Sequence, residues 1–455
     1  MPEELEPTES PAESSDDKPS VAVSRADVRR VVLASFVGTT IEWYDFFIYG
    51  TAAALVFDQL FFPAEDQFLS RMAALATFAI GFFARPLGGI VFGHFGDRVG
   101  RKSMLVATLS MMGVATCLIG VLPTYQTIGL AAPVILVVLR IVQGFGVGGE
   151  WGGAVLMAVE HGHGGRRGLY GSCVQMGVPA GLLLAAGVFA LFSGMPEDQF
   201  LSWGWRIPFL LGIVLLVVGM MIRVQVMESP LFTDVQKRSD VSPMPILDVF
   251  RNHHKNVLLA MGARFAENAC FYLFTVYVLS FATDQLELET RDVLIGVWIA
   301  SAVQLVAIPA FGILSDRIGR RPVYLSGAVF IAAFAFPFFW LIETKVIVLV
   351  WLAIVIGLVG HAAMYGPQAA FFSELFGTNV RYSGASIGYQ LASPFAGGIA
   401  PMVATVLLKW SDNQSWPVSI YIMATAVITV ISVLLAAETF QLDLDQERKQ
   451  SDADR

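Results

Sequence analysis

A charged ten-residue motif occurs twice in this chain, each time between long apolar segments. GHFGDRVGRK spans Gly93–Lys102, and GILSDRIGRR spans Gly312–Arg321, close to half the chain length further on. Both copies have the pattern G-x-x-x-D-R-x-G-R-[K/R]. A repeat of this kind between hydrophobic segments indicates that the chain consists of two homologous halves.

The composition is that of a membrane protein. Hydrophobic residues make up 55% of the chain, charged residues make up 15%, and the mean hydropathy is +0.65. An aqueous fold could not bury so much apolar surface. The net charge of −8 comes from acidic, Ser- and Pro-rich ends, whose composition is typical of solvated tails. The N-terminal tail lacks the pattern of a cleaved signal peptide, and nothing favours nucleic-acid binding.

The apolar segments predict an all-α membrane protein with twelve transmembrane helices in two pseudo-symmetric six-helix bundles. A hydrocarbon core of about 30 Å requires about 20 apolar residues per helix. The predicted spans are 31–57, 68–95, 102–122, 132–160, 168–193, 205–227, 256–283, 292–315, 322–341, 346–372, 383–409 and 417–437.

Polar stretches divide the chain. The longest polar connection separates the sixth span from the seventh, as a linker between two bundles should. The predicted organisation is an acidic cytoplasmic tail over 1–30, an N-terminal bundle over 31–227, a linker over 228–255, a C-terminal bundle over 256–437 and a cytoplasmic tail over 438–455.

Loop charges predict the orientation, because basic loops stay on the cytoplasmic side of a membrane. Both termini are then cytoplasmic. The basic set is Arg98, Arg101, Lys102, Arg166, Arg167, Lys237, Arg238, Arg251, Lys255, Arg317, Arg320, Arg321 and Arg381. The acidic set on the opposite side is Asp58, Glu65, Asp66, Glu197, Asp198, Asp284, Glu287, Glu289 and Asp292.

The doubled motif resembles the signature of the major facilitator superfamily. Several stretches are similar to the metabolite:proton symporter family within it: GTTIEWYDFFIYG (Gly38–Gly50), FFARPLGG (Phe82–Gly89), RIVQGFGVGGEWGGA (Arg140–Ala154), WGWRIPF (Trp203–Phe209) and MESP (Met227–Pro230). Two further stretches, RFAENACFYL (Arg264–Leu273) and RYSGASIGYQLAS (Arg381–Ser393), most resemble shikimate and α-ketoglutarate-type members.

This resemblance implies a carrier in the bacterial inner membrane that moves a small metabolite inward with protons by alternating access. The expected substrate is a small organic anion such as shikimate or a di- or ketocarboxylate. A zwitterion such as proline or betaine, and exchange or facilitated diffusion, are the alternatives within transport. The expected partners are the organic acid, protons and the lipid bilayer, the expected state is a monomer, and no cofactor or metal is expected.

Ionisable residues inside the spans are the candidate functional residues. An ionised side chain in the middle of a membrane helix costs on the order of 2.5–3.5 kcal/mol, so it must face a polar cavity or a partner. In the resembled fold, the first, fourth, seventh and tenth helices line the central cavity. These spans contain Glu42, Asp45, Arg140, Glu150, Arg264, Glu267 and His361.

The predicted proton-coupling residues are Asp45, Arg140, Glu42 and Glu267. Asp45 and Arg140 match positions that are coupled in related proton-driven carriers. Substrate binding to Arg140 would weaken its attraction for Asp45, which would then take up a proton. Glu42 lies one helical turn from Asp45 on the same face. A permanently ionised, structural pair of Asp45 and Arg140 is the alternative.

The predicted substrate-binding residues begin with two arginines, because a guanidinium can hold a carboxylate through two parallel hydrogen bonds. Arg264 could equally be neutralised by Glu267, and aromatic residues in membrane helices also serve as packing anchors. The set is Arg140, Arg264, Glu267, Tyr44, Trp151, Tyr272, Tyr389 and Gln390. His361 fits a packing role better than a titrating one.

The repeated motifs and helix ends supply the predicted gating residues. Asp97 and Asp316 should face the N-terminus of a neighbouring helix, where the helix dipole favours negative charge. Acid–base pairs at the inner helix ends could hold the bundles together, or could merely set the topology. The set is Asp97, Arg98, Arg101, Asp316, Arg317, Arg320, Glu160, Arg167, Glu374, Arg381, Arg85 and Glu150, with Glu150 orienting Arg85.

An enzyme is the alternative from another class, and the sequence gives it little support. GFGVGG at Gly144–Gly149 fits a dinucleotide motif, but it lies inside a long apolar segment with no βαβ unit around it. Its glycines instead have the spacing of close helix contacts. Cys117, Cys173 and Cys270 form no metal pattern, and no catalytic triad order is present.

Overall fold

The structure is a computed structural model. It describes residues 25–99, 101–148, 151–160, 166–225, 249, 251–376 and 381–440. Within these ranges, side chains are not described for residues 25–32, 93–99, 101–103, 105, 153–154, 156–157, 160, 222–225 and 381–383. The predicted N-terminal tail up to residue 24, most of the predicted linker, and the predicted C-terminal tail from residue 441 therefore lie outside the described residues.

The described helices of the first half form six spans. A short helix, α2 (Phe57–Leu60), follows the first span, and another, α5 (Tyr125–Ile128), precedes the fourth. The spans are α1 (Arg25–Leu55); α3 (Gln67–Val99); α4 (Arg101–Val121); α6 (Ala131–Gly148) with α7 (Trp151–Glu160); α8 (Arg167–Gln175) with α9 (Gly177–Ser193); and α10 (Glu197–Gln199), the π-helical turn η1 (Phe200–Gly204) and α11 (Arg206–Gln225).

The second half repeats this arrangement. Its spans are α14 (His254–Tyr272), the π-helical η2 (Leu273–Tyr277) and α15 (Val278–Asp284); α16 (Thr290–Ile318); α17 (Arg320–Glu343); α18 (Ile347–Glu374); α19 (Arg381–Ser393), the π-helical η3 (Pro394–Gly398) and α20 (Ala400–Trp410); and α21 (Trp416–Leu435). The predicted all-α fold of twelve spans is thus confirmed, although the first and sixth spans begin earlier than predicted. Ten of the described helices are long and apolar enough to cross a membrane; α1, which carries Glu42 and Asp45, is not among them.

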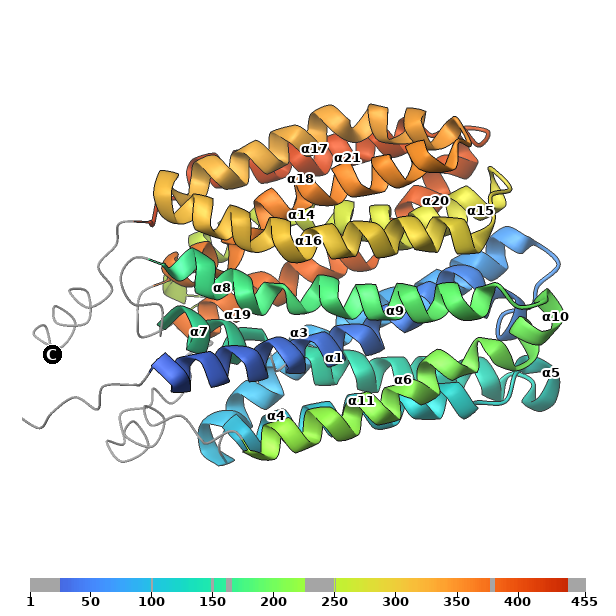
Figure 1. Cartoon of the computed structure of the whole chain (residues 1–455), viewed down its shortest axis with the longest axis horizontal. Coiled ribbons are helices and arrows are strands. Elements are labelled where there is room, and N and C mark those ends of the chain that lie inside the picture. The colour runs from blue at the N-terminus through green and yellow to red at the C-terminus, as the bar shows by residue number, and fades with distance from the viewer. Residues whose placement is uncertain are drawn as a thin grey trace, which may run out of the picture.

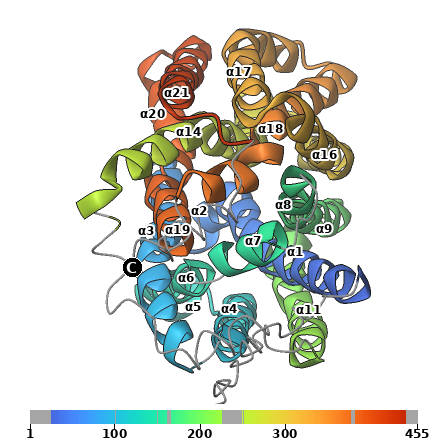
Figure 2. The same cartoon turned by 90° about the vertical axis from the view of Figure 1, so that its left-hand side faces the viewer.

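All spans run along the long axis of the molecule. The N-terminal end of α1 and the C-terminal end of α21 lie at the same end of the bundle, on the left in Figure 1. We call this end the terminal end and the other the opposite end. In the view onto the terminal end, α4, α6 and α11 lie on one side of the molecule, and α17, α18 and α21 lie on the other (Figure 2).

The two halves have the same pattern of helix neighbours. Helix α3 packs on α6 as α16 packs on α18, and α4 packs on α11 as α17 packs on α21. Likewise, α1 packs on α9 and α14 packs on α19. The repeated motif therefore marks a structural repeat as well as a sequence repeat.

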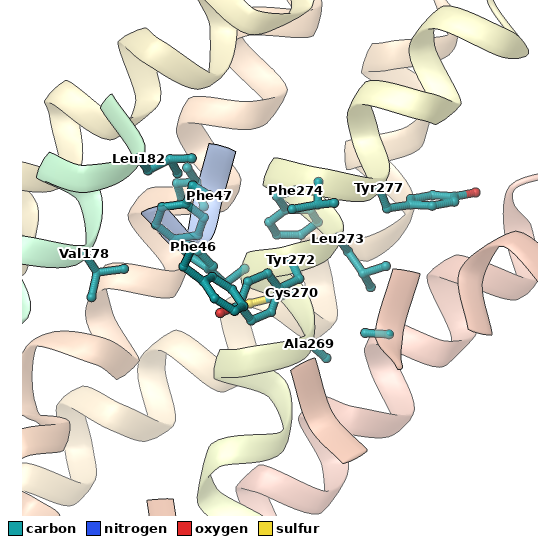
Figure 3. Close-up of a cluster of buried hydrophobic side chains, with 14 of the residues drawn as sticks. Phe46, Phe47, Val178, Leu182, Ala269, Cys270, Tyr272, Leu273, Phe274 and Tyr277 are labelled. Carbon is teal, nitrogen blue, oxygen red and sulfur yellow. The ribbon is translucent and has the colours of Figure 1, made fainter. Parts of the chain in front are cut away.

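The halves meet along a largely apolar interface. Helix α16 lies against α8 and α9, and α3 lies against α19 and η3. In the middle of the molecule, Phe46 and Phe47 of α1 face α14 (Figure 3). The ring centres of Phe46 and Tyr272 are 6.1 Å apart, and those of Phe47 and Phe271 are 5.7 Å apart.

The described glycines of the motif lie in the last turns of α6, where they allow close contact with α3. A Cβ on Gly144 would lie 2.0 Å from the carbonyl oxygen of Gly81, and a Cβ on Gly148 would lie 1.9 Å from that of Arg85. Only a residue without a side chain permits backbones this close. The helix-packing interpretation of this motif is therefore confirmed for its described glycines.

We predict that Gly144→Val lowers the thermal unfolding temperature of the purified protein, because the added methyl groups must push α3 and α6 apart. Overpacking of this kind costs about 1–3 kcal/mol. Gly194→Ala is the matched control, since its nearest neighbour would be 3.6 Å away. Equal unfolding temperatures for the two variants would show that the α3–α6 contact is not tight.

Candidate functional site

A pocket lies between the two halves, near the middle of the bundle. The cavity volume open to water-sized molecules is only about 10 Å³, room for roughly one water, so the pocket must widen to admit a substrate. The first half supplies most of the lining, and α19 supplies the rest. The lining residues are Thr39, Glu42, Trp43, Arg85, Val147, Trp151, Val174, Tyr389 and Gln390.

The predicted substrate-binding residues are only partly in this pocket. Trp151, Tyr389 and Gln390 line it, as do Glu42 and Arg85, which were assigned to proton coupling and gating. The other five predicted binding residues do not line it. These are Arg140, Arg264, Glu267, Tyr44 and Tyr272.

Arg85 is buried among aromatic rings at the edge of the pocket, with only 1% of its surface exposed. Its guanidinium carbon lies 4.2 Å from the ring centre of Phe46 and 4.3 Å from that of Phe82. Its Nε and Nη2 atoms have no hydrogen-bond partner in the described part of the chain. Helix α3 thus presents a cation whose donors are not all used.

A stack of three side chains crosses from one half to the other beside the pocket. The rings of Trp151 and Tyr389 are 3.7 Å apart and 13° from parallel. The guanidinium of Arg264 lies over the Tyr389 ring, 3.0 Å from its centre. Gln390 adds a cross-half hydrogen bond by donating from Nε2 to the carbonyl oxygen of Gly148, at 3.2 Å.

The predicted pair of Asp45 and Arg140 is not a direct ion pair in this structure. Arg140 donates to Gln143 Oε1 at 3.2 Å, and Gln143 Nε2 donates to Thr116 Oγ1 at 2.7 Å. A Cβ on Gly212 would lie 3.1 Å from Asp45 Oδ1 and 3.2 Å from Thr116 Cγ2. Gln143 and Thr116 therefore lie between the two charged groups, but no described hydrogen bond reaches the Asp45 carboxyl group. The predicted direct contact does not form because the Asp45 side chain turns toward α11.

Aromatic rings surround the guanidinium of Arg140, whereas the carboxyl group of Asp45 is buried without such contacts. The guanidinium of Arg140 lies against two rings, 4.3 Å from the centre of Phe46 and 4.1 Å from that of Tyr49. Asp45 is 1% exposed, and neither of its carboxyl oxygens has a hydrogen-bond partner among the described residues. A buried carboxyl group without partners is expensive to ionise.

Glu267 is the centre of a polar network inside the second half. Its carboxylate lies 3.2 Å from His361 Nε2, accepts a hydrogen bond from Gln368 Nε2 at 3.0 Å, and lies 3.9 Å from Arg264 Nε. His361 Nδ1 lies 2.8 Å from Gln304 Nε2. His361 is buried and hydrogen-bonded, in keeping with a packing role, and its partners are Glu267 and Gln304. Sequence reasoning missed Gln304 and Gln368, although amides in apolar spans are a usable signal.

Other predicted residues lie elsewhere. The Tyr44 hydroxyl donates to the carbonyl oxygen of Pro208 at 2.7 Å, away from the pocket. Tyr272 packs edge-on against Phe82, in the aromatic cluster next to Arg85. Glu150, and the side chains of Asp97, Arg98, Arg101, Glu160 and Arg381, lie outside the described residues. Among the described residues, no group of three or more His, Cys, Asp and Glu could hold a metal ion.

At the terminal end, Asp316 of α16 caps a helix of the other half. Its carboxylate accepts hydrogen bonds from the backbone N–H groups of Gly168 and Leu169, at 2.8 and 2.9 Å, at the start of α8. Its Oδ1 also lies 2.6 Å from Arg320 Nη1. The predicted placement of Asp316 at the N-terminus of a neighbouring helix is confirmed.

Glu374 extends this contact into a network that we call the terminal latch, formed by Asp316, Arg320, Glu374 and Arg167. Glu374 receives two hydrogen bonds from Arg320, each at 3.2 Å, and lies 3.7 Å from Arg167 Nη1 of the other half. Arg317 is exposed and is not part of the latch.

The opposite end has its own contacts between the halves. Arg71 of α3 binds Asp58 at 2.9 Å and also forms an ion pair with Asp284 at the end of α15. Lys409 lies 3.7 Å from Asp66, in a more exposed pair. Sequence analysis had used Asp58, Asp66 and Asp284 only to set the orientation, because their pairing with Arg71 and Lys409 depends on how the halves dock.

Comparisons with known proteins agree with this architecture. The sequence matches the profile of the Major Facilitator Superfamily over residues 35–393 and 299–453. It is 41% identical over 428 residues to the shikimate transporter of Escherichia coli (strain K12), covering 93% of this chain and 97% of that protein. It is 34% identical over 423 residues to the proline/betaine transporter of the same strain, covering 90% and 84%. The fold matches a proton:xylose symporter structure with a TM-score of 0.73 at 18% identity, covering 93% and 99%.

We predict that Asp316→Ala loosens the terminal latch, because the start of α8 loses two charge-assisted hydrogen bonds from the other half, each worth about 1–3 kcal/mol. Spin labels at the exposed positions 166 and 317, in a background with Cys117, Cys173 and Cys270 changed to Ser, should then show a population at longer distances.

The control for this measurement is Asp198→Ala, an exposed acid at the opposite end. It should leave the distance distribution unchanged. A distribution in Asp316→Ala that matches the parent protein would contradict a latch role for this carboxylate.

Proposed function

Because the chain belongs to the major facilitator superfamily, we propose that it is a proton-coupled importer of a small organic anion that works by alternating access. The chain is a multi-pass membrane transporter rather than an enzyme. The observation that carries the proposal is a charged pocket between two pseudo-symmetric halves that are joined by ion pairs at both ends. Such joints must break in turn for the pocket to face one side and then the other.

The preference for an anion is supported by the buried arginines. Arg85, Arg140 and Arg264 are all buried, and each has at least one guanidinium N–H group without a partner among the described residues. Buried donors are normally satisfied. An organic anion entering between the halves would supply the missing acceptors. Similarity to the shikimate transporter supports a hydroxylated carboxylate as the first substrate to test.

We place the proton on Asp45 rather than on Glu267. Asp45 has no hydrogen-bond partner for its carboxyl oxygens, whereas Glu267 is held by His361, Gln368 and Arg264. A satisfied carboxylate can stay ionised throughout the cycle, while an unsatisfied one is better suited to gain and lose a proton.

The proposed setting is the bacterial inner membrane, with the terminal end in the cytoplasm. Arg166, Arg317 and Arg321, beside or within the ends of α8, α16 and α17, lie at the terminal end, which supports a cytoplasmic position for it. The expected partners are the organic acid, protons and lipid, and the proposed working unit is a monomer.

A zwitterionic substrate is the second candidate, favoured by the 34% identity to the proline/betaine transporter. Arg85 and Glu42 together could hold a carboxylate and an ammonium group. Uptake of shikimate and of glycine betaine by the same vesicles separates the two candidates directly.

We predict that Asp45→Asn abolishes pH-driven accumulation of shikimate in proteoliposomes but leaves counterflow exchange, because a neutral amide can neither gain nor lose the coupled proton. Glu267→Gln should still accumulate substrate, although with a weaker apparent affinity. Radiolabelled uptake with an imposed pH gradient, acidic outside, measures both modes.

Asp412→Asn, a change at an exposed acid, is the control and should transport like the parent protein. If Asp45→Asn kept pH-driven accumulation, the coupling proton would have to be placed elsewhere. If the parent protein moved no organic acid under any ion gradient, the symporter proposal itself would fail.

A further inference from the structure

The pocket contains one cation among its described lining residues, and that cation is Arg85. Sequence analysis had placed Arg85 in the gate. The structure instead puts it beside Glu42, Trp43 and Gln390, where a bound molecule would touch both halves. The following inference rests on the proposed function and specifies how that substrate is held.

The two unpartnered atoms of Arg85 are Nε and Nη2. These two N–H groups form one edge of the guanidinium and point in the same direction, which is the geometry that binds both oxygens of a carboxylate. Phe46 and Phe82 lie against the guanidinium and hold it in the first half. Both atoms are buried as well as unpartnered among the described residues, so this edge can receive a carboxylate once the halves move apart around the pocket.

The other two buried arginines are less available. With the Asn268 amide turned so that its oxygen faces Arg264, this oxygen lies 2.8 Å from Nε and 3.0 Å from Nη2, so the corresponding edge of Arg264 is occupied. Arg140 does not line the pocket, and a Cβ on Gly81 would lie only 2.5 Å from its Nε. Among the described arginines, Arg85 alone combines an unpartnered edge with a place in the pocket.

The aromatic residues of the pocket do not form a cage for a quaternary ammonium group. Such a cage needs free ring faces. One face of Tyr389 is covered by Arg264, and Tyr389 also stacks on Trp151. The guanidinium of Arg85 lies 5.3 Å from the ring centre of Trp43. Arginine side chains of the protein and ring stacking therefore already occupy faces of these rings.

The rest of the lining suits hydroxyl groups. Gln390 Oε1 has no hydrogen-bond partner among the described residues, while its Nε2 is held by Gly148. The amide is thus fixed in position with a free acceptor. Thr39 and Glu42 also line the pocket. A second carboxylate would meet the Glu42 side chain without another cation in the lining, so a single carboxylate fits best.

We propose that Arg85 binds the carboxylate of a hydroxylated monocarboxylate through Nε and Nη2, while Gln390 Oε1 accepts a hydrogen bond from a substrate hydroxyl. Arg85 belongs to the first half and Gln390 to the second. The substrate therefore bridges the two halves, and its binding favours the state in which they close around it.

The test is a binding experiment by isothermal titration calorimetry on the purified full chain in detergent. The probes are shikimate, its uncharged methyl ester, and glycine betaine. The unchanged protein should bind shikimate about 100-fold more tightly than the ester, because the ester lacks the charge that the buried guanidinium requires. Betaine should bind more weakly than shikimate.

Three variants separate the contacts. Arg85→Gln should reduce the preference for shikimate over the ester to within about 3-fold. Gln390→Leu should weaken both ligands by a similar factor, since both retain the hydroxyls. Arg291→Gln, at an exposed arginine outside the pocket, should change neither affinity. If Arg85→Gln is not monodisperse, Arg85→Lys should keep the fold and lose about 10-fold in shikimate affinity, because an ammonium lacks the bidentate edge.

The outcomes distinguish this inference from the proposed function. If Arg85→Gln or Arg85→Lys bound shikimate as tightly as the parent, the anchor would be wrong while the symporter proposal stood. Tighter binding of betaine than of shikimate by the parent protein would overturn the monocarboxylate assignment. Failure of the parent to transport any organic acid in vesicles would instead overturn the proposed function.

Discussion

Buried charge is the constraint on which the rest of this structure depends. An ionised side chain inside a membrane bundle is stable only when a partner compensates it. In this chain many of the partners come from the other half: the start of α8 for Asp316, Arg167 for Glu374, and Asp284 for Arg71. In the proposed alternating-access cycle, the ion pairs that stabilise the closed bundle would be those that separate when it opens. Fold stability and conformational change depend on the same contacts.

The pseudo-symmetry of the fold gives each contact a defined place. Helices occupy equivalent positions in the two halves. In this arrangement Asp316, in the second copy of the repeated motif, reaches the start of α8, which follows the fourth span. The exposed pair of Lys409 and Asp66 contributes little by comparison, because water screens it. The better-buried latch contacts, centred on Glu374, are those able to hold one conformation against another.

Much of the fold follows from the sequence, because hydropathy, loop charge and an internal repeat each act over many residues. The spans and the helix-capping role of Asp316 were predictable for this reason. The failures involve single side chains. Asp45 turns toward α11 rather than toward Arg140, and Arg85 lines the pocket. Which face of a helix meets which neighbour is decided by packing between distant segments, and no local pattern encodes it.

The geometry also suggests how substrate and proton can influence each other without a direct pair. The ring of Phe46 lies 4.2 Å from the guanidinium carbon of Arg85 and 4.3 Å from that of Arg140. Phe46 follows Asp45 directly in α1, and Arg140 reaches the Thr116 beside Asp45 through Gln143. In the proposed carrier, a carboxylate that neutralises Arg85 would change the electrostatic field around the nearby guanidinium of Arg140. Coupling between substrate and proton in this carrier would then run through α1 and the Phe46 ring. It would not require a direct ion pair of Asp45 and Arg140.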